Sequence, residues 1–307
     1  MSFPPTLKQL RYLVALHRTN HFGKAADTCH VTQSTLSAGL QELENLLGTQ
    51  LVERTKRSVM FTALGEEVVR RAQVILNDVD DLTDMAAAAK DPLKGIVRLG
   101  IIPTIAPFLL PKIMPHIRAE LPDLELMLRE DKSAELCEMV KTGELDLVLF
   151  ALPFACGDVA EMPLFHDPFL VAFPAGEGPD EGINTTDLDE SRLMLLEEGH
   201  CLRDHALEAC QLLGRGARRE LAGTSLNTIV QMVAAGHGIT LLPGMAVEAG
   251  LADGAGVHVV PFRDMVPTRT IGLIWRKTNP RAKTFEALGN VIKKVMHHHG
   301  DNLACAS

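Results

Sequence analysis

The sequence predicts an α/β fold in two parts: a small helical N-terminal unit that ends in a hairpin and one long helix, then a larger unit of alternating strands and helices. Three observations predict this organisation. Residues 1–62 hold short helical periodicities, residues 63–90 keep one unbroken helical pattern, and from residue 96 onward short apolar runs alternate with helical segments. We therefore expect boundaries at 1–62, 63–90 and 91–307.

The first 47 residues contain three helical patterns. Apolar residues from Leu7 to Leu16 predict a helix that ends before Asn20, and further helices are expected at 22–28 and 33–46. The short break His30-Val31-Thr32 separates the last two, with Thr32 placed to cap the third helix. Two short helices joined by such a turn are typical of the helix-turn-helix, whose second helix enters the major groove of DNA.

A hairpin and a long helix follow. The segment LVERTKRSVMFT (51–62) predicts a β-hairpin, or wing, with Arg54, Lys56 and Arg57 near its tip. In residues 63–90 the apolar positions recur about every 3.5 residues, which is typical of a two-stranded coiled coil. This expected seam consists of Leu64, Val68, Ala72, Ile75, Val79, Leu82 and Ala86. The alternative is a single helix packed on its own domain.

Beyond a linker at Asp91-Pro92 and Lys94-Gly95, strands are expected at 96–102, 124–130 and 146–150, with helices at 107–120 and 133–142. After a Pro/Gly-rich crossover, a second set begins with a strand at 192–196. It continues with helices at 203–213 and 225–236, strands at 238–243 and 270–275, and a helix from Arg281. Such alternation favours two units with mainly parallel sheets and a cleft between them.

The net charge of −9 is unevenly distributed. Residues 1–62 carry 7 basic and 4 acidic side chains, whereas 91–307 carry 20 and 29. Attraction to phosphate is local, so a modestly basic head on an acidic body can bind DNA, and two heads in a dimer bind better. No apolar run approaches membrane-spanning length and the N-terminus does not resemble a signal peptide, so we expect a cytoplasmic location and no membrane partner.

Six cysteines are scattered without metal-ligand spacing, and in a reducing cytosol a structural disulfide framework is not expected. We expect no metal and no cofactor, and we interpret the run His297-His298-His299 as incidental. The cysteines are Cys29, Cys137, Cys156, Cys201, Cys210 and Cys305.

Two segments resemble a known family. The run AADTCHVTQSTLSAGLQELENLLGTQLVERTKRSVMFTALG (25–65) resembles the DNA-binding signature of LysR-type transcriptional regulators, and GHGITLLP (236–243) resembles a motif of their second lobe. The resemblance implies a winged helix-turn-helix, a long linker helix and a two-lobed α/β regulatory domain like that of periplasmic binding proteins. LGIIPTIAPFLLP (99–111) and EEGHCLRDHALEAC (197–210) are similar to the hydrogen-peroxide-sensing OxyR branch, which implies four chains in the assembly.

The start of the third helix supplies the candidate DNA contacts. Short hydroxyls and an amide can hydrogen-bond base edges, and Arg54, Lys56 and Arg57 of the wing are expected to meet phosphates. The alternatives are helix capping and a solvated charge run. The candidates on the helix are Thr32, Gln33, Ser34, Thr35 and Ser37.

Cys201 is the candidate peroxidatic residue and Cys210 the resolving one. His200, Arg203 and a helix start favour a thiolate at Cys201, which peroxide would oxidise to a sulfenic acid. Across nine helical residues the two Cα atoms would lie about 13 Å apart, beyond the roughly 7 Å that a disulfide permits. Oxidation would therefore unwind the helix and move Ala206 and Leu207, which we expect to be buried. The alternative is two ordinary core cysteines; Cys137, Cys156 and Cys305 are expected to have no role.

The resemblance also implies the peroxide pocket around Cys201. Thr104 would hold peroxide or water, and Ser133 keeps the hydroxyl of a position where some relatives carry Thr. Arg269 would stabilise the thiolate or the leaving hydroxide, and Asp204 would pair with Arg203 or Arg269. Each of these residues could instead have a structural role.

These observations predict a transcription regulator rather than an enzyme, an activator of antioxidant genes whose partners are double-stranded DNA, hydrogen peroxide, further copies of the chain and RNA polymerase. One alternative is a LysR-type regulator with a small metabolite in the interlobe cleft and inert cysteines. A thiol peroxidase or a solute-binding protein would leave the DNA-binding head unexplained.

Overall fold

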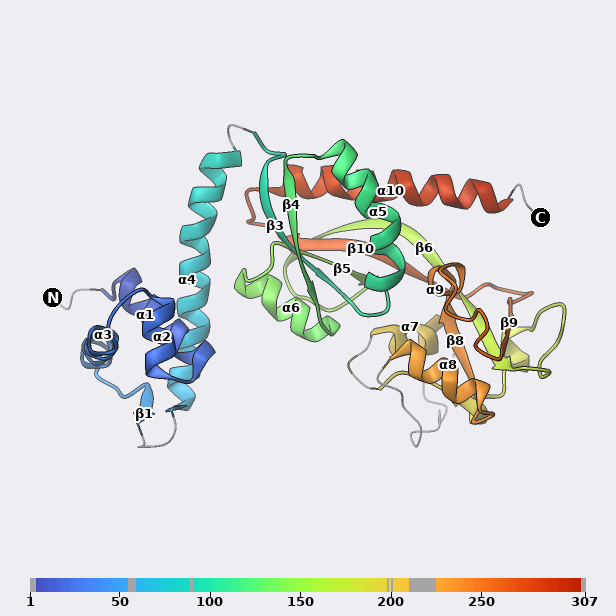
Figure 1. Ribbon diagram of the computed structural model, residues 1–307, viewed down its shortest axis with the longest axis horizontal. Helices are drawn as coiled ribbons and strands as arrows, with labels where there is room; N and C mark the ends of the chain where they lie inside the picture. The colour runs from blue at the N-terminus through green and yellow to red at the C-terminus, as the bar shows by residue number, and fades with distance from the viewer. Residues whose placement is uncertain are drawn as a thin grey trace. The chain divides into compact units, whose positions relative to one another are not determined.

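The computed structural model describes residues 4–54, 59–88, 91–197, 199, 201–209 and 225–304. The chain forms two compact units, Met1–Ala87 with Lys141–Glu144 and Ala88–Val140 with Leu145–Ser307 (Figure 1). Each unit has its own buried apolar core. Among the described residues, no helix combines the length and apolar content that crossing a membrane would require.

The first unit begins with a helix-turn-helix, as predicted. Its helices are α1 (Leu7–Thr19), α2 (Phe22–Thr28) and α3 (Gln33–Leu47). The hydroxyl of Thr32 caps α3 by accepting a hydrogen bond from the Thr35 amide at 3.2 Å. Leu36, Leu40 and Leu43 on one face of α3 are buried with apolar residues of α1, and Gln33, Ser34 and Gln41 are exposed.

A hairpin and a long helix complete this unit. Strands β1 (Val52–Arg54) and β2 (Val59–Phe61) are antiparallel, and the tip between them lies outside the described residues. Helix α4 (Ala63–Ala88) follows directly. A Cβ at Gly65 would lie 2.2 Å from the Leu51 carbonyl oxygen, so this close approach of helix and hairpin requires glycine.

Helix α4 has two apolar faces. Val69, Ala72 and Leu76 are buried in the core of the first unit, whereas Leu64, Ile75 and Leu82 are 48%, 45% and 61% exposed. The seam predicted from the sequence is therefore wrong at Ala72, because this residue faces its own domain. The exposed residues Leu64, Ile75 and Leu82 are 11 and 7 residues apart, close to whole numbers of helical turns, so they lie along one face that a partner helix could cover.

The second unit consists of two lobes. The first lobe contains β3 (Gly95–Ile101), α5 (Ala106–Glu120), β4 (Leu124–Glu130), α6 (Ser133–Thr142), β5 (Leu147–Leu152) and the closing helix α10 (Ala282–Ala304). The second contains β7 (Leu193–Met194), α7 (Cys201–Ala209), α8 (Leu226–Ala234), β8 (Ile239–Pro243), α9 (Gly244–Glu248), β9 (Val257–Val260) and two short 3₁₀ helices, η1 (Thr185–Asp187) and η2 (Glu190–Arg192).

Two long strands, β6 (Val159–Pro174) and β10 (Thr268–Arg276), join the lobes into one sheet. The strand order is β4-β3-β5-β10-β6-β8-β7, and β9 pairs with β6. Pairings β3–β4, β3–β5 and β7–β8 are parallel, and those made by β6 and β10 are antiparallel. The expectation of mainly parallel sheets is therefore met only by β3, β4 and β5 of the first lobe, because β6–β8 and β6–β9 in the second lobe are antiparallel.

Strand β6 is not predicted by the sequence pattern, which assigns this region to a crossover. Pro163 and Pro168 lie inside the strand, and proline normally indicates a break because it cannot donate a ladder hydrogen bond. The register between β10 and β6 shifts at Ile271/Gly272, and Gly272 is the residue opposite Pro163. This irregularity accommodates the proline, and the strand continues.

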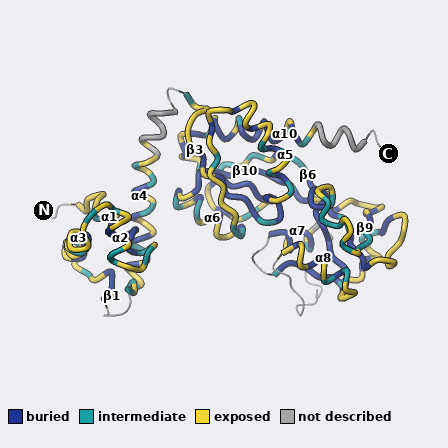
Figure 2. Tube along the Cα trace, viewed as in Figure 1, coloured by how far each residue is buried: buried dark blue, intermediate teal, exposed yellow. Residues whose placement is uncertain are grey.

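The two lobes have separate cores (Figure 2). In the first, β5 is buried along its whole length and packs between β3 and β10. In the second, Phe169, Val171 and Leu241 lie among the buried residues of β6 and β8. Helix α7 belongs to both cores, because Cys201 packs with the first and Leu202 and Ala206 pack with the second.

Candidate functional site

The exposed start of α3 places the predicted DNA-contacting residues on one surface. Thr32, Gln33, Ser34 and Thr35 are exposed and Ser37 is half-buried. The hydroxyl of Thr32 lies 2.9 Å from that of Ser34 and 2.8 Å from that of Thr35. Thr32 is thus a structural cap as well as a surface residue, while Gln33 is the longest exposed side chain of this group.

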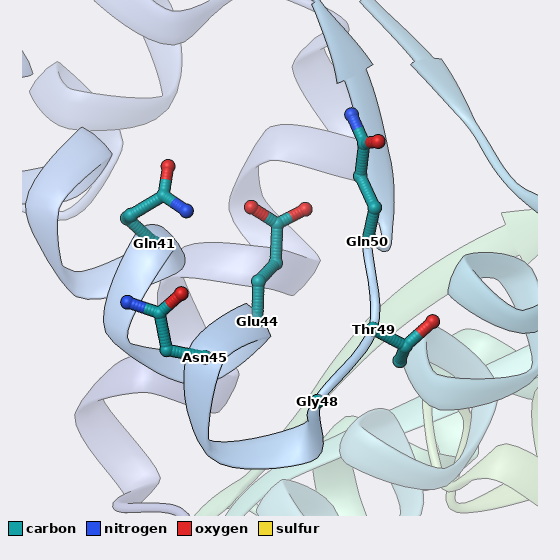
Figure 3. Close-up of a pocket in the computed structure, with 6 residues that line it drawn as sticks. All are labelled: Gln41, Glu44, Asn45, Gly48, Thr49 and Gln50. Atoms are coloured by element: carbon teal, nitrogen blue, oxygen red, sulfur yellow. The ribbon is translucent and has the colours of Figure 1, made fainter.

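The wing is described only in part. Arg54 ends β1, and Lys56 and Arg57 lie outside the described residues. The turn that leads from α3 into the hairpin lines the pocket in Figure 3, which consists of Gln41, Glu44, Asn45, Gly48, Thr49 and Gln50. Glu44 accepts hydrogen bonds from the Leu51 and Val52 amides at 2.9 and 3.0 Å. This carboxylate therefore fixes the start of the wing.

Cys201 is the first residue of α7 and is 4% exposed. Gly199, two residues earlier, has φ +96°, a conformation that side chains with a Cβ rarely adopt. Lys132, directly before α6, pairs with Glu197, which precedes this turn, through Nζ and Oε1 at 2.7 Å. The approach to α7 is thus joined to the start of α6.

Three groups from the first lobe and β10 act on the Cys201 sulfur. Burial raises the pKa of the Cys201 thiol, and the Ser133 hydroxyl, the Arg269 guanidinium and the Ala151 amide oppose that rise. The sequence pattern reveals only groups that favour the thiolate, because burial at this position is not visible in it. The resting group is a buried thiol beside donors that can stabilise its anion.

Ser133 begins α6 and is 2% exposed. Its hydroxyl has no hydrogen-bond partner within the described part of the chain, although it lies near enough to Cys201 to influence the thiol pKa. An unpaired buried hydroxyl is costly and rare in folded proteins. This one is available to a ligand or to a charged form of Cys201.

Arg269 is 1% exposed and connects three elements. Its Nη1 and Nη2 donate to the Oγ1 and carbonyl oxygen of Thr104 at 3.0 and 3.1 Å, and its Nε donates to Oδ2 of Asp167 at 2.9 Å. Burial raises the pKa of Asp167, and Arg269 and the Met245 amide oppose that effect. Resemblance places Thr104 and Arg269 near Cys201 but does not identify Asp167, which holds the guanidinium in place.

His205 is a further residue that sequence reasoning missed. It lies four residues after Cys201, hence on the same face of α7, and is 8% exposed. Its Nε2 lies 3.1 Å from the Pro153 carbonyl oxygen, which can only accept, so the proton belongs to Nε2. Its Nδ1 has no partner among the described residues. Burial lowers the pKa of His205, which favours a neutral ring with a free lone pair.

The other predicted pocket residues are less central. His200 and Cys210 lie outside the described residues. Arg203 is half-buried, whereas Asp204 is exposed and raises the pKa of the Cys201 thiol. The expected ion pair of Asp204 with Arg203 or Arg269 does not occur among the described side chains. Ala206 is 1% exposed, as expected, and Leu207 is half-buried.

The length of α7 determines which bonds Cys201 can form. Its Cα lies about 12 Å from that of Ala209 in a regular helix, and Cα atoms of adjacent residues are about 3.8 Å apart. A disulfide to the next residue, Cys210, requires Cα atoms within about 7 Å. The helix as described is incompatible with that bond, and Cys201 is a free thiol in this structure.

The structure contains a disulfide between Cys137 and Cys156, with Cα atoms 5.6 Å apart. The expectation that no structural disulfide is present is wrong for this pair, because folding brings α6 and the loop after β5 together. Cys29 is free, and Cys305 lies outside the described residues. In the part of the chain that the structure describes, no three His, Cys, Asp or Glu side chains gather to hold a metal.

Comparisons with known proteins agree with this arrangement. Residues 7–66 match the family model for bacterial regulatory helix-turn-helix proteins of the lysR family, and residues 90–297 match the LysR substrate binding domain. The chain is 42% identical over 300 residues to the HTH-type transcriptional regulator EstR of Acinetobacter baylyi, covering 96% of this chain and 98% of that one.

Two further comparisons involve OxyR proteins. The chain is 39% identical over 299 residues to an Escherichia coli regulator, covering 97% of this chain and 98% of that one. That relative is named DNA-binding transcriptional dual regulator OxyR in strain K12 and hydrogen peroxide-inducible genes activator in O157:H7. The structure of a full-length OxyR variant from Pseudomonas aeruginosa is 37% identical, with a TM-score of 0.76 and 95% of each chain covered. Because family models and relatives match along nearly the whole length, the chain belongs to the LysR family of bacterial transcription regulators.

Proposed function

We propose that this chain is a DNA-binding transcription regulator that senses hydrogen peroxide through Cys201 and Cys210. One observation carries the proposal: a free Cys201 lies at the start of a short helix, beside the guanidinium of Arg269 and the buried hydroxyl of Ser133, which has no partner among the described residues. The names of the OxyR relatives support peroxide as the signal. If Cys201 reacts with one peroxide and then stays in the disulfide until a reductant restores the thiols, the chain acts as a sensor rather than as an enzyme with multiple turnovers.

The chemistry balances without a cofactor. The Cys201 sulfur attacks one peroxide oxygen, the O–O bond breaks, and the thiol proton leaves with the other oxygen as water, giving a sulfenic acid. The Cys210 thiol then attacks that sulfur, and the second water leaves as the disulfide forms. Arg269 stabilises negative charge on the attacking sulfur and the departing oxygen, and Ser133 and Thr104 orient the peroxide.

The disulfide acts as a switch because α7 has to open before the bond can form. Leu202 and Ala206 of α7 are buried in the core of the second lobe, so unwinding removes apolar side chains from that core. Oxidation thereby selects between two packings of one segment. The change would reposition neighbouring subunits and alter which DNA half-sites the assembly contacts.

The DNA end of the proposal rests on α3 and the wing. Gln33, Ser34 and Ser37 would contact base edges or phosphates in the major groove, and Thr32 and Thr35 would hold the helix start in position. The exposed apolar face of α4 would pair with a second chain, and two dimers would form the tetramer. We propose a cytoplasmic protein that recruits RNA polymerase to antioxidant genes.

The decisive experiment is disulfide mapping by mass spectrometry after brief exposure to micromolar peroxide. The expected product is the Cys201–Cys210 bond, absent in Cys201→Ser, with Cys29→Ser as the matched control. Footprints of reduced and oxidised protein on target DNA should differ. Free thiols at both positions, identical footprints, or a Cys201→Ser variant that still responds would contradict the sensor and favour a regulator of the same family that binds a small metabolite.

A second experiment tests the wing. Replacing Arg54, Lys56 and Arg57 with alanine should weaken binding to all DNA sequences alike. The slope of log affinity against log salt should fall by about 0.9 for each phosphate that the protein no longer neutralises. Unchanged affinity and slope would show that this charge cluster is only solvated.

A further inference from the structure

The Cys137–Cys156 disulfide lies in the same core as Cys201. Cys137 is on α6 and Cys156 is in the loop between β5 and β6, and their exposed fractions are 3% and 1%. The bond therefore joins a helix to a loop.

Each end of this bond lies close in sequence to a group that surrounds Cys201. Ser133, whose hydroxyl acts on the Cys201 thiol, precedes Cys137 by four residues and so lies on the same face of α6. The β5 end carries the Ala151 amide, which acts on the same thiol, and the Pro153 carbonyl, which accepts from His205. Cys156 follows that carbonyl by three residues.

We propose that Cys137 and Cys156 form a second thiol–disulfide site, and that its state sets how fast Cys201 reacts with peroxide. With the bond closed, the Ser133 hydroxyl is held at a fixed distance from the loop that anchors His205 through Pro153. With the bond open, α6 and the loop can separate, and the groups around Cys201 are less well positioned. Reactivity of a positioned nucleophile falls steeply with such displacements.

Closing the Cys137–Cys156 bond requires a peroxide as the oxidant, and opening it requires a dithiol as the reductant. To close the bond, one thiol attacks hydrogen peroxide, giving a sulfenic acid and water, and the other thiol displaces a second water as the disulfide forms. To open it, a dithiol reductant takes over the bond by thiol–disulfide exchange, and is itself oxidised to a disulfide. Since both sulfurs are buried, either step requires local opening and should be slower than the reaction of Cys201.

This inference rests on the proposed function, because it concerns the rate of that same Cys201 reaction. The test uses the full chain with Cys210→Ser, so that the Cys201 sulfenic acid persists and is captured by dimedone. One sample is treated with a dithiol and desalted without oxygen, and the other is kept oxidised at Cys137–Cys156. Alkylation and mass spectrometry establish the state of every cysteine before peroxide is added.

The closed form should react roughly tenfold faster at Cys201 than the open form. In the same Cys210→Ser background, Cys137→Ser/Cys156→Ser and Cys137→Ala/Cys156→Ala variants should both match the open form, and Cys29→Ser should match the closed one. Because the open and closed samples of the Cys210→Ser chain share one sequence, a folding defect in the variants cannot produce the difference between them. Equal, measurable rates in the two forms, or Cys137 and Cys156 thiols that never join under oxidising conditions, would overturn the second site alone. No reaction at Cys201 in either form would overturn the proposed function and this inference with it.

Discussion

The start of α3 and the surroundings of Cys201 use polar side chains in opposite ways. At α3 the hydroxyls of Thr32, Ser34 and Thr35 are exposed and bond to one another or to the helix start. Around Cys201 the Ser133 hydroxyl and the Nδ1 atom of His205 are buried without partners in the described chain. The exposed hydroxyls at α3 can bind a large partner that approaches from solvent. The buried groups near Cys201 can be satisfied by a small bound molecule or by negative charge on the Cys201 sulfur.

The largest expected effect comes from Arg269. Replacing it with alanine leaves Asp167 as a buried carboxylate without its cation, since the two side chains are 0% and 2% exposed. Loss of one partner of such a pair costs about 3–5 kcal/mol. Chemical denaturation should show this loss for Arg269→Ala. The control Arg263→Ala, whose pair with Glu181 is 47% and 88% exposed, should lose less than about 1 kcal/mol. If both variants lost similarly little free energy of unfolding, the buried Arg269–Asp167 pair would not be a main source of stability.

The next largest effect is expected for Ser133→Ala, which should lower the rate of Cys201 oxidation rather than the stability of the fold. Because its buried hydroxyl has no partner among the described residues of the reduced protein, Ser133→Ala should leave the free energy of unfolding unchanged or raise it. It should slow sulfenic acid formation at Cys201 roughly tenfold, since a donor to developing charge is removed. Dimedone capture measures the rate, and Ser191→Ala, a solvent-exposed serine bonded to Asp189, is the matched control. A normal rate together with reduced stability would assign Ser133 a structural role.

The two regions also differ in how far the sequence predicts them. The helix-turn-helix depends on local signals, and the bounds of α2 and the Thr32 cap were predicted because capping and periodicity act within a few residues. The Cys201 site gathers groups from the turn after β3 and from α6, β5, β6 and β10. Asp167 was missed because it lies in β6, where two prolines obscured the strand, and burial of Cys201 is a tertiary property.

Some parts of the sensor site could have been predicted from the sequence and others could not. His205 follows Cys201 by one helical turn, and this spacing alone places the two on one face of α7. The Cys137–Cys156 bond had no such signal, because a separation of 19 residues does not define which cysteines meet. Resemblance supplied Thr104, Ser133 and Arg269, which meet only because the turn after β3, the start of α6 and strand β10 pack together.

A smaller effect is expected at the exposed helix start. Thr32→Ala removes the acceptor of the Thr35 amide, and loss of an N-cap typically costs about 1 kcal/mol. Ser34→Ala removes an exposed hydroxyl that does not cap the helix, so it should change the stability of the first unit much less. Thermal unfolding and DNA affinity measured on both variants separate capping from contact. Equal stability with equal loss of affinity would assign Thr32 to DNA contact rather than to the cap.

The smallest effect concerns pH. Burial lowers the pKa of His205 below the ordinary value of 6.5, so the unfolded chain takes up this proton at a higher pH than the folded one. The stability due to the neutral ring is complete above about pH 6.5 and falls as the pH decreases below that value. His205→Gln, which cannot take up a proton, should show a shallower decline of unfolding free energy between about pH 7 and pH 5 by denaturant titration. The exposed His237→Gln should keep the wild-type slope, and a His205→Gln slope identical to wild type would show that this ring is not kept neutral by the fold.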